Sequence, residues 1–89
     1  MTGQRSGTTM PIMLFGSLGA SVGRELTANI PPQGCSVGEL KAQLLARGPE
    51  YQALGRATVK ACVDQVMVTD QHLLRGHEEV AFFPPVSGG

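Results

Sequence analysis

The chain of 89 residues ends in EVAFFPPVSGG, residues 79–89, and this stretch guides the interpretation of everything before it. Its first part, residues 80–83, is a short apolar run of the kind that forms a buried strand. Pro84 and Pro85 follow directly, and because proline cannot continue a sheet interior, they favour a stiff, extended exit. We therefore expect a last strand from which residues 84–89 leave as a tail.

The tip of this tail is Gly88-Gly89, which places an α-carboxylate behind two residues that have no side chains. Six residues reach roughly 20 Å at about 3.3 Å each, so the carboxylate can lie deep in another protein. There it can be activated and carry a group. The residues expected to occupy a narrow channel of a partner are Pro84, Pro85, Val86, Ser87 and Gly88. The plainer alternative is a frayed chain end without a role.

Composition excludes several classes of function. Seven basic and seven acidic residues cancel, so charge gives no reason to expect nucleic acid or a membrane surface as partner. No apolar run approaches the roughly 20 residues that span a bilayer. Two cysteines are too few for a disulfide scaffold, which favours a cytoplasmic location. Residues 1–9 resemble neither a signal nor a transit peptide, so we expect a flexible leader before one domain, residues 10–83.

The first part of that domain predicts a hairpin. Residues 11–15, PIMLF, form an apolar run typical of a strand, and residues 24–30 alternate as a second strand. The glycine- and serine-rich residues 16–23 between them predict a turn or a loose helical turn. Their spacing matches neither a P-loop nor G-x-G-x-x-G, so a connector is expected there and not a phosphate site.

The strongest helix signal follows the hairpin. Ser36 stands three residues before Glu39, which is the spacing of a capping box, and Cys35 and Leu40 occupy the positions of a hydrophobic staple. Apolar residues then recur at the helical period, at Val37, Leu40, Leu44 and Leu45. Glycine and proline at 48 and 49 are expected to end the helix.

The remaining residues complete the predicted fold. Residues 49–55 predict a short second helix, and residues 59–63 alternate as a strand. Asp64-Gln65 is a plausible tight turn into residues 66–68, and residues 80–83 supply the last strand. This order predicts an α+β fold, in which one main helix packs on one face of a four- to five-stranded mixed sheet.

The first and last strands are apolar on both of their faces. Successive side chains of a strand point to opposite faces, so each strand divides into two sets. Ile12 and Leu14 oppose Met13 and Phe15, and Val80 and Phe82 oppose Ala81 and Phe83. One helix covers one face, so we expect an apolar binding surface beside the tail on the other. The alternative is that the second short helix or a loop covers it.

The cysteines are weak candidates for chemistry. Cys35 lies beside a helix N-terminus, where the pKa of a thiol can fall, but its staple position favours packing. Cys62 lies in a predicted strand and is expected to be a packed thiol.

The histidine and acidic residues are also weak candidates for metal binding or catalysis. His72 and His77 are five residues apart, which is not the helical spacing of a zinc site, so no metal is expected. Glu78 and Glu79 are expected to be ordinary solvated charges of a turn. No set of residues matches a catalytic triad or a carboxylate pair, so we expect a carrier or binding module and not a stand-alone enzyme.

Residues 76–89, with the ending quoted above, resemble the end of the MoaD-type sulfur carriers, the ubiquitin-like small subunits of molybdopterin synthase. The likeness extends over roughly residues 10–89 and includes the capped helix and the hairpin of residues 59–68. The tail motif is highly specific, whereas the rest is generic for the β-grasp fold that the resemblance implies. Residues 16–23 depart from the family, in which a more helical, charged stretch is usual.

The resemblance implies a chemical role for Gly89. An ATP-dependent adenylating enzyme of the ubiquitin-activating type would convert its carboxylate to an acyl-adenylate, and a sulfur donor protein would displace AMP to leave a thiocarboxylate. The tail would then enter the large subunit of the synthase and give sulfur to the pyranopterin precursor of the molybdenum cofactor. The chain itself would bind no cofactor, and the catalytic groups would lie in the large subunit.

The resemblance also separates two neighbouring aromatic residues. Phe83 corresponds to the outward apolar position that contacts partners, and Phe82 then lies in the core. Rival functions are a sulfur carrier for thiamine or cysteine synthesis, a ubiquitin-like modifier whose Gly89 bonds to lysine, and an interaction domain with an inert tail. Thiamine-type carriers are usually shorter and lack the second helical segment, here residues 49–55.

Overall fold

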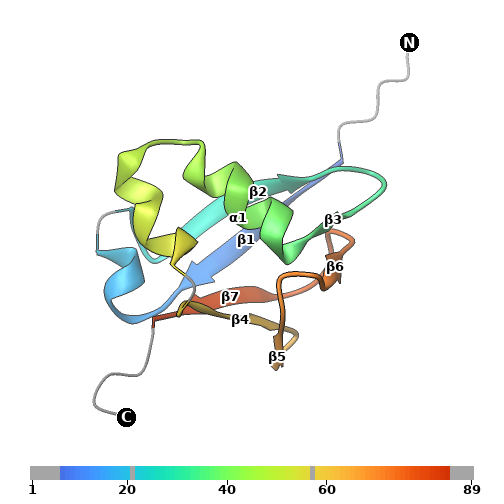
Figure 1. Ribbon diagram of the computed structural model, residues 1–89. Coiled ribbons are helices and arrows are strands. Elements are labelled where there is room, and N and C mark those ends of the chain that lie inside the picture. Colours follow the sequence, from blue (N-terminus) through green and yellow to red (C-terminus); the bar gives the residue numbers. More distant parts are fainter. Residues whose placement is uncertain (1–6, 21, 57, 85–89) are drawn as a thin grey trace.

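The computed structural model describes residues 7–20, 22–56 and 58–84, which form a mixed five-stranded sheet in the order β2-β1-β7-β4-β5 (Figure 1). β1 and β7 run parallel at its centre, and every other neighbouring pair is antiparallel. The strands are β1 (Thr8–Leu14), β2 (Glu25–Ile30), β4 (Lys60–Val63), β5 (Val66–Val68) and β7 (Val80–Phe83). The α+β fold and the mixed sheet predicted from the sequence are confirmed.

The main helix, α1 (Val37–Leu45), begins at the predicted capping box. The Ser36 hydroxyl accepts from the Glu39 backbone N–H at 3.0 Å, and the Glu39 carboxylate accepts from the Ser36 N–H at 2.8 Å. The helix ends at Leu45, earlier than the glycine and proline at 48 and 49, because the chain tightens there into i→i+3 hydrogen bonds. The short second helix, η2 (Pro49–Gly55), has the predicted bounds and is a 3₁₀ helix.

Both helices lie on the same side of the sheet, as Figure 1 shows for α1 and the yellow segment that follows it. Phe82 and Ile12 are fully buried from the strands, as are Leu40 and Leu44 from α1 and Leu54 from η2. These side chains belong to one continuous core between the helices and the sheet. The second short helix therefore extends the helix-covered face and leaves the opposite face free.

The first strand begins earlier than the sequence predicted. Thr8 pairs with Ile30 and Thr9 with Asn29, so the folded domain starts two residues before residue 10. Threonine is β-branched and polar, so it favours an extended strand that is partly exposed. Pairing with β2 continues along these residues, and β1 therefore spans the whole length of β2. The expected leader is thus at least two residues shorter than residues 1–9, and residues 1–6 lie outside the described part of the chain.

Short connections complete the fold. Residues 64 and 65 both adopt positive φ, as a two-residue hairpin turn requires, which confirms the predicted turn between β4 and β5. The expected loose turn of residues 16–23 contains a 3₁₀ helix, η1 (Gly16–Gly19), with Leu18 buried. A second, two-stranded sheet of β3 (Cys35–Ser36) and β6 (Leu73–Leu74) was not predicted. Over the described residues, no helix combines the length and hydrophobicity needed to cross a membrane.

Candidate functional site

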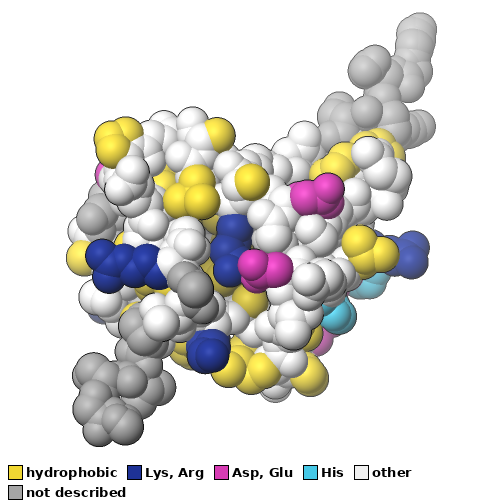
Figure 2. Space-filling view, viewed as in Figure 1, with side chains coloured by type: hydrophobic (Ala, Val, Ile, Leu, Met, Phe, Trp, Pro, Cys, Tyr) yellow, Lys and Arg dark blue, Asp and Glu magenta, His cyan; other side chains and the backbone are white. Residues whose placement is uncertain are grey.

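The sheet face opposite α1 carries a cluster of uncovered apolar side chains, which we call the bare face. Its members are Pro11, Met13, Phe15, Cys62, Ala81 and Phe83, and they surround an open cleft of about 560 Å³. Met13 is 41% exposed and Phe15 is 43% exposed, although both belong to or adjoin the central strand β1. In the space-filling view, hydrophobic side chains gather along the lower edge of the molecule, over β4 and β5 (Figure 2).

Phe15 and Phe83 form the end of the bare face nearest the tail. Their rings stack with centroids 4.5 Å apart and an interplanar angle of 14°. The backbone N–H of Phe15 donates to the carbonyl of Phe82 at 3.0 Å, which ties β7 to the chain after β1. Such an aromatic pair stabilises by about 0.5–1.5 kcal/mol beyond the area that it buries. The pair therefore fixes the point at which the chain leaves the sheet.

The two neighbouring phenylalanines of β7 point in opposite directions, as predicted. Phe82 is completely buried among the core residues, whereas Phe83 is half-buried on the bare face. Alternation along the strand accounts for the difference. The predicted contact of Phe83 with a partner remains a prediction, because the structure holds a single chain.

Pro84 is the only predicted tail residue within the described part of the chain. Gly16, with φ of +59°, lies so close that a Cβ at this position would be 2.8 Å from Cγ of Pro84. A side chain at position 16 would thus displace the proline ring. Glycine therefore allows the loop after β1 to support the root of the tail. The predictions for the other tail residues lie outside the described part of the chain, and these residues are Pro85, Val86, Ser87, Gly88 and Gly89.

Glu78 was predicted to be an ordinary solvated charge, and this prediction is wrong. Its carboxylate accepts hydrogen bonds from the backbone N–H groups of Arg75, Gly76 and His77, at 2.9 to 3.1 Å. Burial alone would raise the pKa of Glu78, but these backbone donors outweigh it and lower the pKa below the ordinary value. The carboxylate therefore holds the loop before β7 in shape.

A second carboxylate anchors the start of β7. The Glu79 N–H donates to the Asp64 carboxylate at 2.9 Å, and the Asp64 N–H donates to the Glu79 carbonyl at 2.8 Å. The turn between β4 and β5 is thereby joined to β7. The end of the bare face away from the tail is thus built from carboxylates that serve the backbone.

Cys35 takes the packing role that was expected, whereas Cys62 is only half-buried. Cys35 is buried, and burial, followed by the negative charges of Glu39 and Glu78, raises the pKa of its thiol. A thiol held protonated in this way is a poor nucleophile. Cys62 lies on the bare face, with its Sγ 3.3 Å from Sδ of Met67. Among the described residues, no group of three or more His, Cys, Asp or Glu side chains is placed to hold a metal ion.

Sequence reasoning missed Pro11 as a member of the bare face and Met67 as the neighbour of Cys62, although the sequence carries a signal for each. Pro11 stands two residues before Met13, so alternation places both on one face. The two-residue turn at 64 and 65 sets the register of its hairpin and brings Met67 opposite Cys62. The position of Gly16 against Pro84 has no comparable sequence signal, because it depends on the parallel pairing of β1 and β7.

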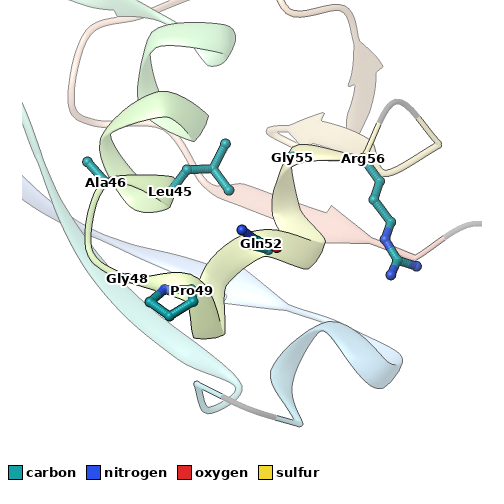
Figure 3. Close-up of a pocket in the computed structure, with 7 residues that line it drawn as sticks. All are labelled: Leu45, Ala46, Gly48, Pro49, Gln52, Gly55 and Arg56. Atoms are coloured by element: carbon teal, nitrogen blue, oxygen red, sulfur yellow. The ribbon is translucent and has the colours of Figure 1, made fainter.

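A second cleft lies between the end of α1 and η2, with a volume of about 730 Å³ (Figure 3). Among the described residues that line it, Arg56 alone is charged, and in Figure 3 the Arg56 side chain points away from α1 and the rest of the lining. None of the lining residues can act as a general base or nucleophile. This cleft is larger than the one on the bare face, but it belongs to the helix side of the sheet. The bare face, which continues into Pro84, is the candidate site.

A mixed sheet in this strand order, crossed on one face by a single main helix, defines a β-grasp domain of the ubiquitin-like class. Solved structures share the fold. SAMP1 from Haloferax volcanii matches with a TM-score of 0.76 and 20% identity, covering 91% of this chain and 99% of its own. A putative molybdopterin converting factor subunit 1 from Pyrococcus furiosus matches with a TM-score of 0.73 and 19% identity, covering 90% and 100%.

The family follows from the sequence comparisons. The model of the ThiS family matches residues 12–89, so the chain belongs to the ThiS family. A curated relative, the molybdopterin synthase sulfur carrier subunit of Escherichia coli (strain K12), is 33% identical over 82 residues, which cover 88% of this chain and 96% of the relative. The resemblance to the ubiquitin-like sulfur carriers that the tail predicted is confirmed.

Proposed function

We propose that this chain is a sulfur carrier that acts as the small subunit of a molybdopterin synthase. The observation that carries the proposal is the 33% identity, over nearly the whole of both chains, to the sulfur carrier subunit of that enzyme. Membership of the ThiS family and the apolar bare face beside the tail support it. The chemical group that carries the sulfur is the carboxylate of Gly89.

The chemistry requires activation of that carboxylate, because a carboxylate is a poor acyl donor until it has a good leaving group. An adenylating enzyme joins the Gly89 carboxylate to AMP and releases pyrophosphate from ATP. A sulfur donor protein then supplies sulfur at the oxidation level of sulfide, which attacks the acyl carbon, expels AMP and leaves a C-terminal thiocarboxylate. In the transfer, the sulfur bonds to the pyranopterin precursor and water cleaves the acyl–sulfur bond, which returns the Gly89 carboxylate and regenerates the chain.

The bare face is the surface through which the large subunit docks. Met13, Phe15 and Phe83 supply apolar area for a partner to cover, and covering such area stabilises a complex by about 25 cal/mol per Å² before its costs. Pro84 begins the tail at the rim of this surface, so docking aims residues 84–89 at the partner. The catalytic groups then belong to the large subunit, and this chain contributes the sulfur-bearing terminus.

Intact-mass spectrometry tests the proposal directly. The purified chain is incubated with ATP, the adenylating enzyme and a sulfur donor protein, and then with the large subunit and the pyranopterin precursor. We expect a gain of about 16 Da, one oxygen exchanged for sulfur, in the first step and its reversal in the second. Omission of ATP and a chain that lacks Gly89 are the controls. Absence of any mass gain would contradict the proposal.

The same experiment separates the rival functions. A gain of about 16 Da that persists with the large subunit and precursor, but is lost to a different acceptor, indicates a carrier for thiamine or cysteine synthesis. Conjugates of higher mass, linked through Gly89 to lysine, indicate a protein modifier. The 3₁₀ helix η2, with buried Leu54, favours the molybdopterin carriers over the shorter thiamine type that lacks this segment.

A further inference from the structure

The sheet has two outer strands, and β2 is the longer of them at six residues. An outer strand presents unpaired backbone N–H and C=O groups, to which another strand can bind. In the β1–β2 pair, the Leu14 N–H donates to the Arg24 carbonyl at 2.8 Å. Because hydrogen-bonded and non-hydrogen-bonded pairs alternate, the backbone groups of Thr27 and Asn29 point away from β1.

A glutamine of α1 takes up the outward groups of Asn29. The Gln43 side-chain amide donates from Nε2 to the Asn29 carbonyl at 3.0 Å, and its Oε1 accepts from the Asn29 N–H at 3.3 Å. A side-chain amide has the same donor and acceptor as a peptide group. Gln43 therefore makes the pair of hydrogen bonds that one residue of a neighbouring antiparallel strand would make.

Arg47 continues the same cover along the strand. Its Nη2 donates to the Thr27 carbonyl at 2.5 Å. Four residues of a helix advance by about 6.0 Å and two residues of a strand by about 6.8 Å, so the two spacings match. The Arg47 guanidinium carbon also lies 6.0 Å from the centre of the Tyr51 ring, which holds the side chain at this edge.

We infer that Gln43 and Arg47 close the β2 edge to strand pairing, and that the edge they cover is complementary to β2 of a second copy of this chain. Antiparallel pairing of two β2 strands about Thr27 places each Asn29 opposite the Glu25 of the second copy. Such a contact is self-complementary and has two-fold symmetry, which is the commonest form of association between identical chains. The helix side chains therefore keep the edge closed to such a contact.

The first test removes the cover. The variant Gln43→Ala/Arg47→Ala is compared with the natural chain by analytical ultracentrifugation over a range of concentrations. Gln52→Ala/Arg56→Ala is the matched control, because it removes the same residue types from η2 and its end. We expect a concentration-dependent dimer for the first variant only. A folded variant that sediments as the natural chain does would overturn the inference.

A proline locates the contact. Thr27→Pro, added to the first variant, removes only an outward N–H, because Thr27 belongs to a non-hydrogen-bonded pair with β1. We expect this proline to abolish the dimer. A dimer that persists with Pro at position 27 forms elsewhere, for example through the bare face, and contradicts the inference.

Amide hydrogen exchange decides the matter where the double variant does not fold. In the single variant Gln43→Ala, we expect the Asn29 amide to exchange about fivefold faster, because one hydrogen bond is lost. The amide of Ala28, whose partner is in β1, is the internal control and should exchange as before. Unchanged exchange at Asn29 would show that Gln43 does not protect the edge.

Discussion

The two faces of the sheet are built by the same strands, yet only one of them is covered. In β1 and β7, Ile12 and Phe82 are fully buried beneath α1, while their neighbours Met13 and Phe83 lie on the bare face. The chain therefore has apolar side chains on both faces and a single helical layer. Within the described residues, no segment covers these apolar side chains beside the exit of the chain, which supports the proposed partner.

The two faces also differ in which backbone groups their polar side chains hydrogen-bond. On the helix side, Gln43 and Arg47 satisfy the backbone of the outer strand β2. On the bare face, Glu78 satisfies the loop that leads into β7. In both sets, the polar side chains hold the backbone of the described residues in place.

Removal of Gly89 has the largest expected effect, because it should abolish sulfur loading without destabilising the fold. The variant should gain no sulfur at all, while its melting temperature stays within about 1 °C of that of the natural chain. The mass assay and thermal unfolding are the measurements. A large fall in melting temperature would instead mean that the terminus packs on one of the two faces.

Phe82→Ala tests the helix-covered face, because it removes a large buried side chain from the core. A fully buried phenylalanine replaced by alanine costs about 3–5 kcal/mol of unfolding free energy, through lost burial and the cavity that remains. Urea unfolding followed by circular dichroism measures the change. A loss below about 1 kcal/mol would contradict the assignment of Phe82 to the core.

Phe83→Asp tests the bare face, because it places a charge among its apolar side chains. It should weaken binding to the large subunit by about 30-fold or more, since central aromatic anchors contribute about 2 kcal/mol or more. Its effect on unfolding free energy should be much smaller than that of Phe82→Ala. Calorimetric titration and urea unfolding give the two numbers, and the opposite order would exchange the roles of the two residues.

Gly16→Ala tests the contact between the loop after β1 and Pro84. Positive φ and the approach of Pro84 together should cost about 1–2 kcal/mol and slow thiocarboxylate formation. Gly23→Ala is the matched control, because Gly23 has φ of +99° but nothing within 4 Å of a Cβ. Unchanged thiocarboxylate formation in Gly16→Ala would mean that the contact with Pro84 is unimportant for the tail.

The smallest expected effect is the pH dependence of the Glu78 anchor. Because the pKa of Glu78 is lowered in the folded chain, its contribution to stability is present above the ordinary value of 4.5. That contribution is lost as the pH falls through the lowered pKa. Glu78→Gln should reduce the acid sensitivity of thermal unfolding, whereas Glu50→Gln, at an exposed site on η2, should not.

Local signals in the sequence predicted most of the fold. The capping box at Ser36 and Glu39, the turn at residues 64–65 and the opposite directions of Phe82 and Phe83 each depend on residues close together in the chain. Each also has a direct physical cause: a hydrogen bond, a positive φ or strand alternation. The division of the sheet into a covered and a bare face followed from these.

The features that escaped prediction are those set by distant residues. β3 and β6 have two residues each and pair across nearly 40 positions, so neither carries a periodic signal. Gln43 and Asn29 meet only because α1 lies along β2. Glu78 was misjudged because its role depends on the loop conformation around Gly76, which has φ of +113°. Tertiary context, which one sequence does not display, decides all three.

The parallel contact between β1 and β7 has a consequence for how the chain is made. β1 is the first strand to be synthesised and β7 the last, yet they are neighbours at the centre of the sheet. The apolar residues of β1 therefore cannot pair with β7 until β7 has been synthesised. Contacts between residues so distant in sequence also form slowly. Folding is thus a late event in the life of each nascent chain, so a truncated product would lack a completed body on which to present any terminus.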